Sequence, residues 1–147
     1  MMKSIPVWKQ ELSDGVHAAR LASLYCCSPA ETASEAARYT AVLDGLEKTF
    51  GSHAEAGLYS APGRTEIGGN HTDHQHGRVL AGSVNIDMIA AAAPNDKNQL
   101  RVQSEGYDLC VIDLNDLEAR KEEENTTAAL LRGECAAFTQ RGAKLAG

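Results

Sequence analysis

The chain has 147 residues, which suits one domain or part of one. Hydrophobic residues make up 43% of it, enough to build a core and too many for a disordered chain. With 14 basic and 20 acidic residues the net charge is −6, so the chain lacks the basic surface of a nucleic-acid-binding protein.

The first 51 residues are expected to be mainly helical. Residues 28–31 read Ser-Pro-Ala-Glu, a typical helix start in which Ser28 caps the helix and Glu31 completes a capping box. A stop is expected at Gly51. Apolar residues recur between these points at helical spacing, and they are Ala36, Tyr39, Leu43, Leu46 and Phe50. A shorter helix is expected at residues 16–24.

From residue 57 the pattern changes to strands and turns. Strands are expected at residues 58–61, 84–93, 100–104 and 108–114. The first should end at a tight turn formed by Pro62 and Gly63, and the last two can form a hairpin across Glu105 and Gly106.

The C-terminal part is expected to hold one further helix. A charge run at residues 118–124 is interpreted as a solvated loop or helix start. A helix should follow over residues 128–141, with an apolar face formed by Leu131, Cys135 and Phe138. Helices, then strands, then a helix indicate an α+β fold, with a mixed α/β fold as the alternative.

Features of the whole chain favour a cytoplasmic protein. Residues 1–12 contain no apolar core of a signal peptide, and no run of about 18 apolar residues could span a membrane. The cysteines show no CxxC spacing and are expected to be buried free thiols in a reducing compartment. They are Cys26, Cys27, Cys110 and Cys135.

Residues 61–87 are the best candidates for a binding or catalytic site. Polar side chains gather there on glycine-rich turns, namely Arg64, Glu66, Asn70, His71, Asp73, His74 and His76. Such a segment suits a sugar or another polyol, because a carboxylate such as Asp73 can accept hydrogen bonds from two vicinal hydroxyls. The alternative is a metal-dependent hydrolase with ligands His71, Asp73, His74 and His76. Consecutive residues point in different directions, which makes a metal site the weaker hypothesis.

The same segment resembles the sugar-binding signature of galactokinases, which share a superfamily with homoserine, mevalonate and phosphomevalonate kinases. The matching positions, in register and without a gap, are Gly63, Arg64, Ile67, Gly69, His71 and Asp73. The resemblance is sharp over residues 61–80. It implies that residues 1–147 are the N-terminal portion of a two-domain fold, with residues 1–56 as a mainly helical lead-in and residues 57–147 as strands, signature and helix.

The resemblance also implies a reaction, the ATP-dependent phosphorylation of galactose or a closely related hexose at its anomeric hydroxyl. Arg64 would be the catalytic residue near the reacting hydroxyl, and Asn70, His71 and Asp73 would bind the sugar. Asn70 stands where the family has glutamate, so the exact sugar is left open. A non-catalytic sugar sensor with the same signature is the alternative function.

The phosphate-binding loop of the superfamily, roughly Gly-Leu-Ser-Ser-Ser-Ala, does not occur in the chain. ATP and Mg²⁺ are therefore expected to bind mainly to residues outside it. The expected partners are the sugar, ATP and the rest of the polypeptide, but neither a nucleic acid nor a membrane. The 147 residues alone are expected to be inactive.

Overall fold

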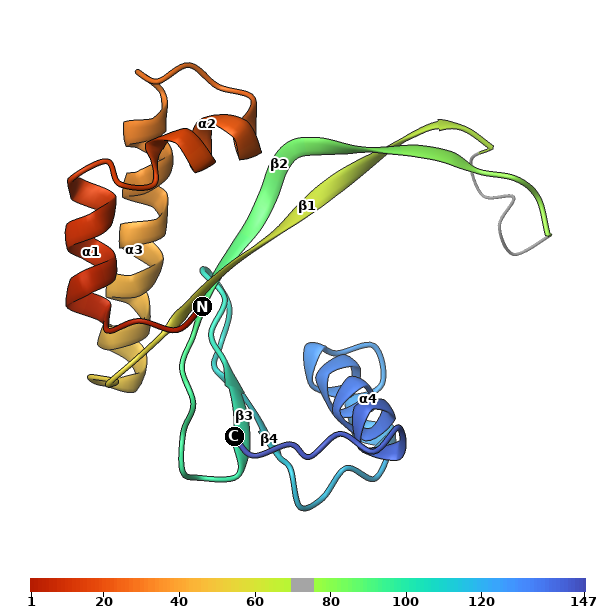
Figure 1. Cartoon of the computed structure of the whole chain (residues 1–147). Helices are drawn as coiled ribbons and strands as arrows, with labels where there is room; N and C mark the ends of the chain where they lie inside the picture. Colours follow the sequence, from red (N-terminus) through yellow and green to blue (C-terminus); the bar gives the residue numbers. More distant parts are fainter. Residues whose placement is uncertain (70–75) are drawn as a thin grey trace. The chain divides into compact units, whose positions relative to one another are not determined.

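A computed structural model describes residues 1–69 and 76–147. The chain divides into two compact units, Met1–Ala93 and Pro94–Gly147, which are described separately below (Figure 1). In the described part of the chain no helix is both long and apolar enough to cross a membrane. The combination of helices and small antiparallel sheets confirms the α+β class.

The N-terminal unit begins with the helices α1 (Ile5–Ser13), α2 (Ala18–Tyr25) and α3 (Thr32–Phe50). Helix α1 was not predicted separately; it carries a proline in its first turn and buries Ile5 and Leu12. Helix α2 starts at Ala18, after Gly15 with a φ of 71°, and not at residue 16. The stop of α3 at Gly51, with a φ of 85°, is confirmed.

The predicted capping box at the start of α3 is wrong in position. The carboxylate of Glu31 accepts hydrogen bonds of 2.7 Å from the backbone N–H and the hydroxyl of Ser28, as in such a box. These bonds lie in a turn that precedes the helix. The same turn is closed by a hydrogen bond from the backbone N–H of Glu31 to the carbonyl oxygen of Ser28. Glu31 is therefore the N-cap of a helix that begins at Thr32.

The core of this unit lies between the helices and a two-stranded ribbon. The predicted buried face of α3 is confirmed, since Tyr39, Leu43 and Leu46 are buried while Ala36 and Phe50 pack against them. The core is completed from α1, α2 and the start of the ribbon by Ile5, Leu12, Leu21, Tyr25 and Ala56.

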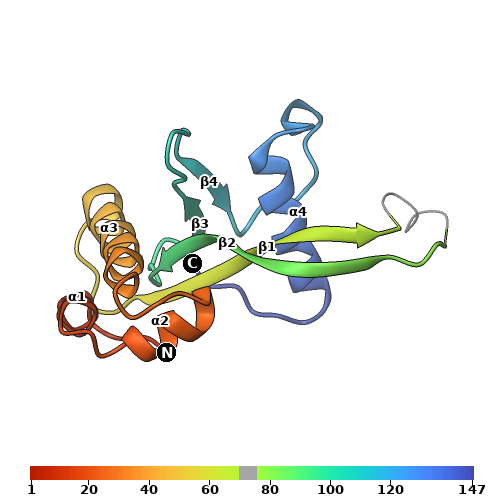
Figure 2. The ribbon, with the colours of Figure 1, turned by 90° about the horizontal axis from the view of Figure 1, so that it is seen from above.

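The ribbon consists of β1 (Gly57–Gly68) and β2 (Leu80–Ala92), which pair antiparallel (Figures 1 and 2). The predicted tight turn at Pro62 and Gly63 is wrong, because β1 runs straight through both residues. The register shifts between Pro62 and Arg64, where the ribbon has an irregularity of the β-bulge type. A proline is tolerated there because each strand of a two-stranded ribbon has an unpaired edge.

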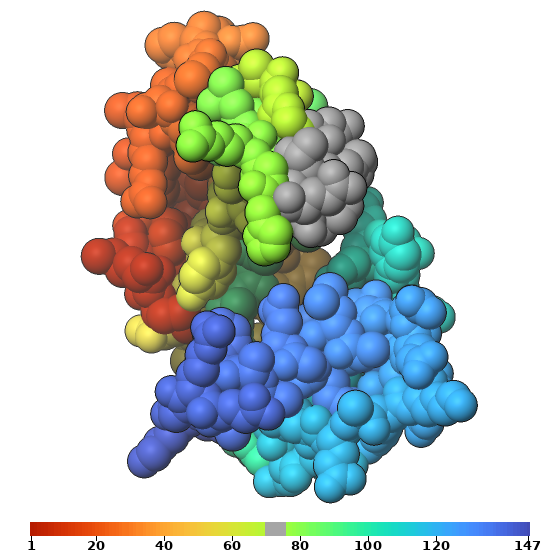
Figure 3. Space-filling view, turned by 90° about the vertical axis from the view of Figure 1, so that its right-hand side faces the viewer, coloured from red at the N-terminus to blue at the C-terminus, as the bar shows by residue number. Residues whose placement is uncertain are grey.

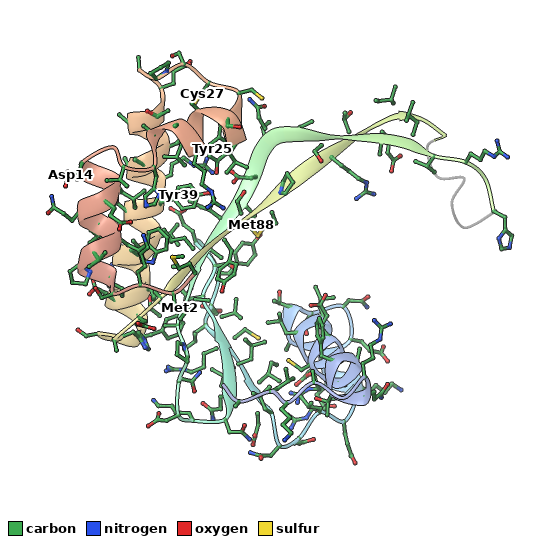
Figure 4. All side chains as sticks on the ribbon, in the orientation of Figure 1. Met2, Asp14, Tyr25, Cys27, Tyr39 and Met88 are labelled. Carbon is green, nitrogen blue, oxygen red and sulfur yellow. The ribbon has the colours of Figure 1, made fainter. Side chains whose placement is uncertain are left out.

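The two faces of the ribbon differ in exposure. On one face, Leu58, Ile89, Ala91 and Ala93 pack against the core of the helices. On the other, Tyr59, Ile86 and Met88 are exposed, Met88 by 78%. Figure 4 shows Tyr25 and Tyr39 between the helices and β2, with Met88 on the other side of the strand. This part of the ribbon therefore has one covered face and one uncovered apolar face.

The C-terminal unit contains β3 (Gln99–Val102), β4 (Cys110–Asp113), a 3₁₀ turn η2 (Lys121–Glu123) and α4 (Thr127–Gln140). The predicted hairpin is confirmed, with antiparallel strands and a φ of 79° at Gly106 in the connection. Thr126 caps α4 by accepting a hydrogen bond from the backbone N–H of Ala129. The surface of this unit is coloured from cyan to blue in Figure 3.

Two predictions about side chains in this chain are wrong. Phe138 was expected on the buried face of α4 but is 57% exposed, and the buried residues of that helix are Arg132 and Cys135. All the cysteines are free thiols, but Cys26 is exposed and only Cys135 is fully buried. Cys26 ends α2 in a left-handed conformation with a φ of 50°.

Candidate functional site

Arg64, the predicted catalytic residue, lies on the exposed outer half of β1, opposite Ser83 of β2. Its guanidinium Nη2 lies 3.3 Å from Oε1 of Glu66, two residues further along the strand and therefore on the same face. The Arg64 side chain is 73% exposed. Exposed ion pairs contribute about 0–1 kcal/mol, so Glu66 holds the guanidinium only weakly and leaves it accessible to a ligand.

The predicted sugar-binding residues Asn70, His71 and Asp73 lie outside the described residues, as does His74. Near the boundary, Gly69 has a φ of 80° and faces the backbone of Arg78. A Cβ added at Gly69 would lie 2.1 Å from the carbonyl oxygen of Arg78, a collision with rigid backbone. Only glycine fits this close approach, which brings the chain at Gly69 back beside the chain at Arg78.

The metal alternative receives no support from the residues that can be described. Of its predicted ligands only His76 is described, and it is exposed, with a φ of 60°. Within residues 1–69 and 76–147, no group of three or more histidine, cysteine or acidic residues could hold a metal ion.

A polar cluster, which was not predicted, lies where the ribbon meets the helices, and it is centred on the buried side chain of Asp87 of β2. The Asp87 side chain is only 3% exposed. Its Oδ2 accepts hydrogen bonds of 2.5 Å from the Tyr25 hydroxyl and 2.6 Å from the Ser60 hydroxyl. Its Oδ1 accepts a bond of 2.9 Å from Nη2 of Arg38. A single carboxylate therefore joins α2, α3 and both strands of the ribbon.

Further contacts from Tyr39 and Glu35 hold Tyr25 and Arg38 in place. The Tyr25 and Tyr39 hydroxyls are 2.8 Å apart, and because Tyr25 donates its proton to Asp87, Tyr39 must be the donor to Tyr25. Nη1 of Arg38 is paired with Glu35 at 2.5 Å, and the guanidinium lies over the Tyr25 ring at 5.7 Å from its centroid.

The cluster shifts the pKa values of its members in the directions expected of a closed network. Burial acts to raise the pKa of Asp87, but hydrogen bonds from Ser60, Tyr25 and Arg38 outweigh it and keep the carboxyl below its usual pKa. Burial, followed by the bond to Asp87, raises the pKa of Tyr25. The bond to Asp87 likewise raises the pKa of Arg38 above its usual value. Asp87 is therefore a fixed anion and Tyr25 a fixed donor near neutral pH.

Arg132 of α4 forms the corresponding buried ion pair of the C-terminal unit. Its guanidinium donates to both carboxylate oxygens of Glu123, at 2.8 and 2.7 Å, and to the carbonyl oxygen of Asp116. The bond from Arg132 lowers the pKa of Glu123. The charge run was predicted to be solvated, and for Glu123 this prediction is wrong, because its side chain is only 16% exposed and paired with Arg132. An open hollow of about 940 Å³ adjoins this pair, but the Arg132 charge is already neutralised and is not offered to a ligand.

The ribbon lies in the part of the chain that matches a known protein family. Residues 46–94, which include the end of α3 and both strands β1 and β2, match the family model of the galactokinase galactose-binding signature. This range contains Arg64 and Asp87 as well as the predicted sugar-binding residues.

Galactokinases are also found among the similar curated proteins. The galactokinase of Ligilactobacillus salivarius is 35% identical over 83 residues, which are 54% of this chain and 21% of that protein. The galactokinase of Lacticaseibacillus casei is 34% identical over 68 residues, 46% of this chain and 17% of its own length. The match thus spans about a fifth of the length of these relatives. No solved structure matches the chain. The resemblance to the N-terminal portion of galactokinases is confirmed.

Proposed function

We propose, from the galactose-binding signature on residues 46–94, that the chain supplies part of the sugar site of a hexose kinase. The intact protein would transfer the terminal phosphate of ATP to the anomeric hydroxyl of galactose or a closely related hexose. The observation that carries this proposal is the signature match, together with the similarity to galactokinases over 83 residues.

In this proposal the residues of the signature have separate roles. His71, Asp73 and Asn70 hydrogen-bond the sugar hydroxyls, and the Asp73 carboxylate accepts from two of them. Arg64 lies near the reacting hydroxyl and stabilises the negative charge that develops there. Its exposure and its weak pairing with Glu66 suit this role, because the guanidinium can turn to a ligand without breaking a strong bond.

Phosphoryl transfer depends mostly on positioning the reactants and on stabilising charge. ATP and Mg²⁺ would be bound mainly by residues outside the chain, and Mg²⁺ would neutralise the phosphate oxygens. A non-catalytic galactose sensor would share the same sugar site. It is distinguished from the kinase by product formation and not by sugar binding.

The test is to compare kcat/KM of the intact protein over a panel of hexoses for variants of the signature. Asp73→Ala should lower kcat/KM on the best sugar by at least about tenfold, since hydrogen bonds to a charged group contribute about 1.5–3 kcal/mol each. Asn70→Ala should cost less, because the amide is neutral. Asn70→Glu should shift preference towards galactose if the native sugar is another hexose.

The matched control is Asp96→Ala, which removes an exposed carboxylate from the bend before β3 in the C-terminal unit. It should leave kcat/KM unchanged. Near-native values for folded Asp73→Ala on the best sugar would refute the proposed sugar site. Sugar binding without any sugar phosphate would favour the sensor over the kinase.

A further inference from the structure

The position of Asp87 along the ribbon is the starting point. The residues that pack the ribbon on the helices, Ile89, Ala91 and Ala93, all follow Asp87 in the chain. On the other side of Asp87, residues 80–83 of β2 and 61–68 of β1 are mainly exposed (Figure 1). Asp87 therefore lies where the ribbon leaves the helices, before the exposed outer part that carries Arg64.

The pairing of the ribbon is also irregular at this point, as it is again between Glu66 and Gly68. The register shifts between Pro62, the partner of Asp87, and Arg64. An irregularity of this kind bends a strand locally, and a two-stranded ribbon has little stability of its own. The backbone pairing alone does not fix the direction of the outer half, and a contact outside the ribbon is needed.

The Asp87 cluster supplies such a contact from several directions. Tyr25 approaches from the end of α2, Arg38 from α3, and Ser60 from the neighbouring strand. Asn85, two residues before Asp87 in β2, donates a bond of 3.3 Å to the carbonyl oxygen of Tyr25. Bonds that converge on one carboxylate from different elements restrict its rotation as well as its position.

A small tilt of β2 at Asp87 becomes a large displacement at Leu80, the end of the strand nearest to the predicted sugar-binding residues. At about 3.3 Å per residue, β2 spans roughly 23 Å from Asp87 to Leu80, so tilting it by about 10° would move that end by about 4 Å. A displacement of only about 1 Å can cost a catalysed reaction on the order of a hundredfold. The sugar site therefore needs the ribbon to be held rigidly at its base.

We propose that Asp87 is a positioning residue. Together with Tyr25, Arg38 and Ser60 it fixes the direction of the outer ribbon, residues 64–68 and 80–83, relative to α2 and α3. It acts through the ribbon on Arg64 and touches neither sugar nor phosphate. The consequence for sugar recognition rests on the proposed function, whereas the fixed direction of the ribbon does not.

The test measures backbone amide residual dipolar couplings in the 147-residue chain. Couplings from residues 64–68 and 80–83 are compared with those from α3. In the wild-type chain one alignment tensor should fit both sets. In Asp87→Asn the couplings of the outer ribbon should fall by at least about half, while those of α3 are unchanged. A residue that only stabilises the fold would lower the melting temperature and leave the couplings of the folded molecules intact.

Two serine variants keep the test decisive if Asp87→Asn does not fold. Ser60→Ala removes one donor to Asp87 and should weaken the outer couplings, whereas Ser83→Ala, opposite Arg64, should not. Unchanged couplings in Ser60→Ala and Asp87→Asn, or separate tensors already in the wild-type chain, would overturn the proposal.

Titration with galactose then separates this proposal from the proposed function. Asp87→Asn should weaken the binding seen for the wild-type chain by at least about threefold. Unchanged affinity would overturn the link between Asp87 and the sugar. If the wild-type chain bound no galactose, this part of the sugar site would be insufficient for binding by itself, and the couplings alone would still decide the role of Asp87.

Discussion

The hydroxyl of Tyr25 donates a hydrogen bond of 2.5 Å to Oδ2 of Asp87, a residue 62 positions later in the chain. Both side chains are almost completely buried, so the bond joins the end of α2 to β2 inside the N-terminal unit (Figure 4). The receiving oxygen is charged and has little contact with water, which makes this bond stronger than one between neutral groups.

Removing this hydroxyl should destabilise the N-terminal unit more than removing its neighbour. Tyr25→Phe should lower the free energy of unfolding by about 1.5–3 kcal/mol, the range for a bond to a charged group. Tyr39→Phe removes a bond between two hydroxyls and should cost about 0.5–1.5 kcal/mol. Urea unfolding followed by the fluorescence of Trp8, the single tryptophan, reports on this unit. An equal loss in both variants would contradict this ranking.

The lowered pKa of Asp87 predicts a loss of stability in acid. Because the carboxyl binds its proton less readily in the folded than in the unfolded state, its contribution is complete above about pH 5. It is lost as the pH falls below the usual value of 3.8 and through the folded pKa. The free energy of unfolding should therefore rise less steeply with pH, between about pH 2 and 5, in Asp87→Asn than in the wild-type chain.

A matched control separates this effect from acid sensitivity in general. Asp14→Asn changes an exposed aspartate at the end of α1 (Figure 4) and should keep the wild-type slope. Some slope should also persist in Asp87→Asn, because Lys3 and His17 lower the pKa of Glu11 in the same unit. Equal slopes in Asp87→Asn and the wild-type chain would show that Asp87 carries no pH dependence.

Glu123 should stabilise the C-terminal unit, whereas its neighbour in the charge run should not. Glu123→Ala leaves the Arg132 guanidinium, whose side chain is 5% exposed, without its carboxylate partner. Breaking a buried pair in this way costs about 3–5 kcal/mol. Glu122 is exposed, and Glu122→Ala should change stability by less than about 0.5 kcal/mol. Hydrogen exchange of the α4 amides in both variants measures the difference, and similar exchange rates would contradict it.

Features that depend on residues close together in the chain, such as helix faces and turns, could be predicted from the sequence. Contacts between residues far apart in the chain could not. Helical spacing located Tyr39, Leu43 and Leu46 in the core, and turn residues located the hairpin of the C-terminal unit. The Asp87 cluster could not be predicted, because its members lie on separate elements. The available signal was a pair of polar residues, Asn85 and Asp87, at alternate positions of an otherwise apolar strand.

The errors have a common physical origin in tertiary contacts. Pro62 and Gly63 are turn residues by local preference, but both lie within β1, where Pro62 pairs with Asp87 and the register shifts at Gly63. The spacing that placed Phe138 in the core did not allow for Arg132, which occupies the buried face of α4 because Glu123 neutralises it. The catalytic role expected of Arg64 stays a prediction, and the structure places this residue exposed on β1.

The uncovered apolar face of the ribbon should make the 147-residue chain self-associate. Met88→Lys places a charge on this exposed face and should reduce association without loss of stability. Ile89→Lys, one residue later, faces the core and should instead destabilise the unit by as much as about 3 kcal/mol. Sedimentation velocity and thermal melting test both variants. A monomeric wild-type chain that melts cooperatively above roughly 65 °C would oppose this prediction.

The chain by itself should not transfer phosphate from ATP to galactose. A phosphate-binding loop of the type Gly-Leu-Ser-Ser-Ser-Ala does not occur in the sequence, and bringing both reactants together is worth about 7–11 kcal/mol of the barrier. An exposed arginine such as Arg64 can stabilise charge but cannot supply that alignment alone. Phosphorus NMR of the purified chain with ATP, Mg²⁺ and galactose should show no sugar phosphate. Arg64→Ala is the control for a contaminating kinase, whose product would form equally with both chains. Sustained product that disappears in Arg64→Ala would mean that these 147 residues already contain a complete site.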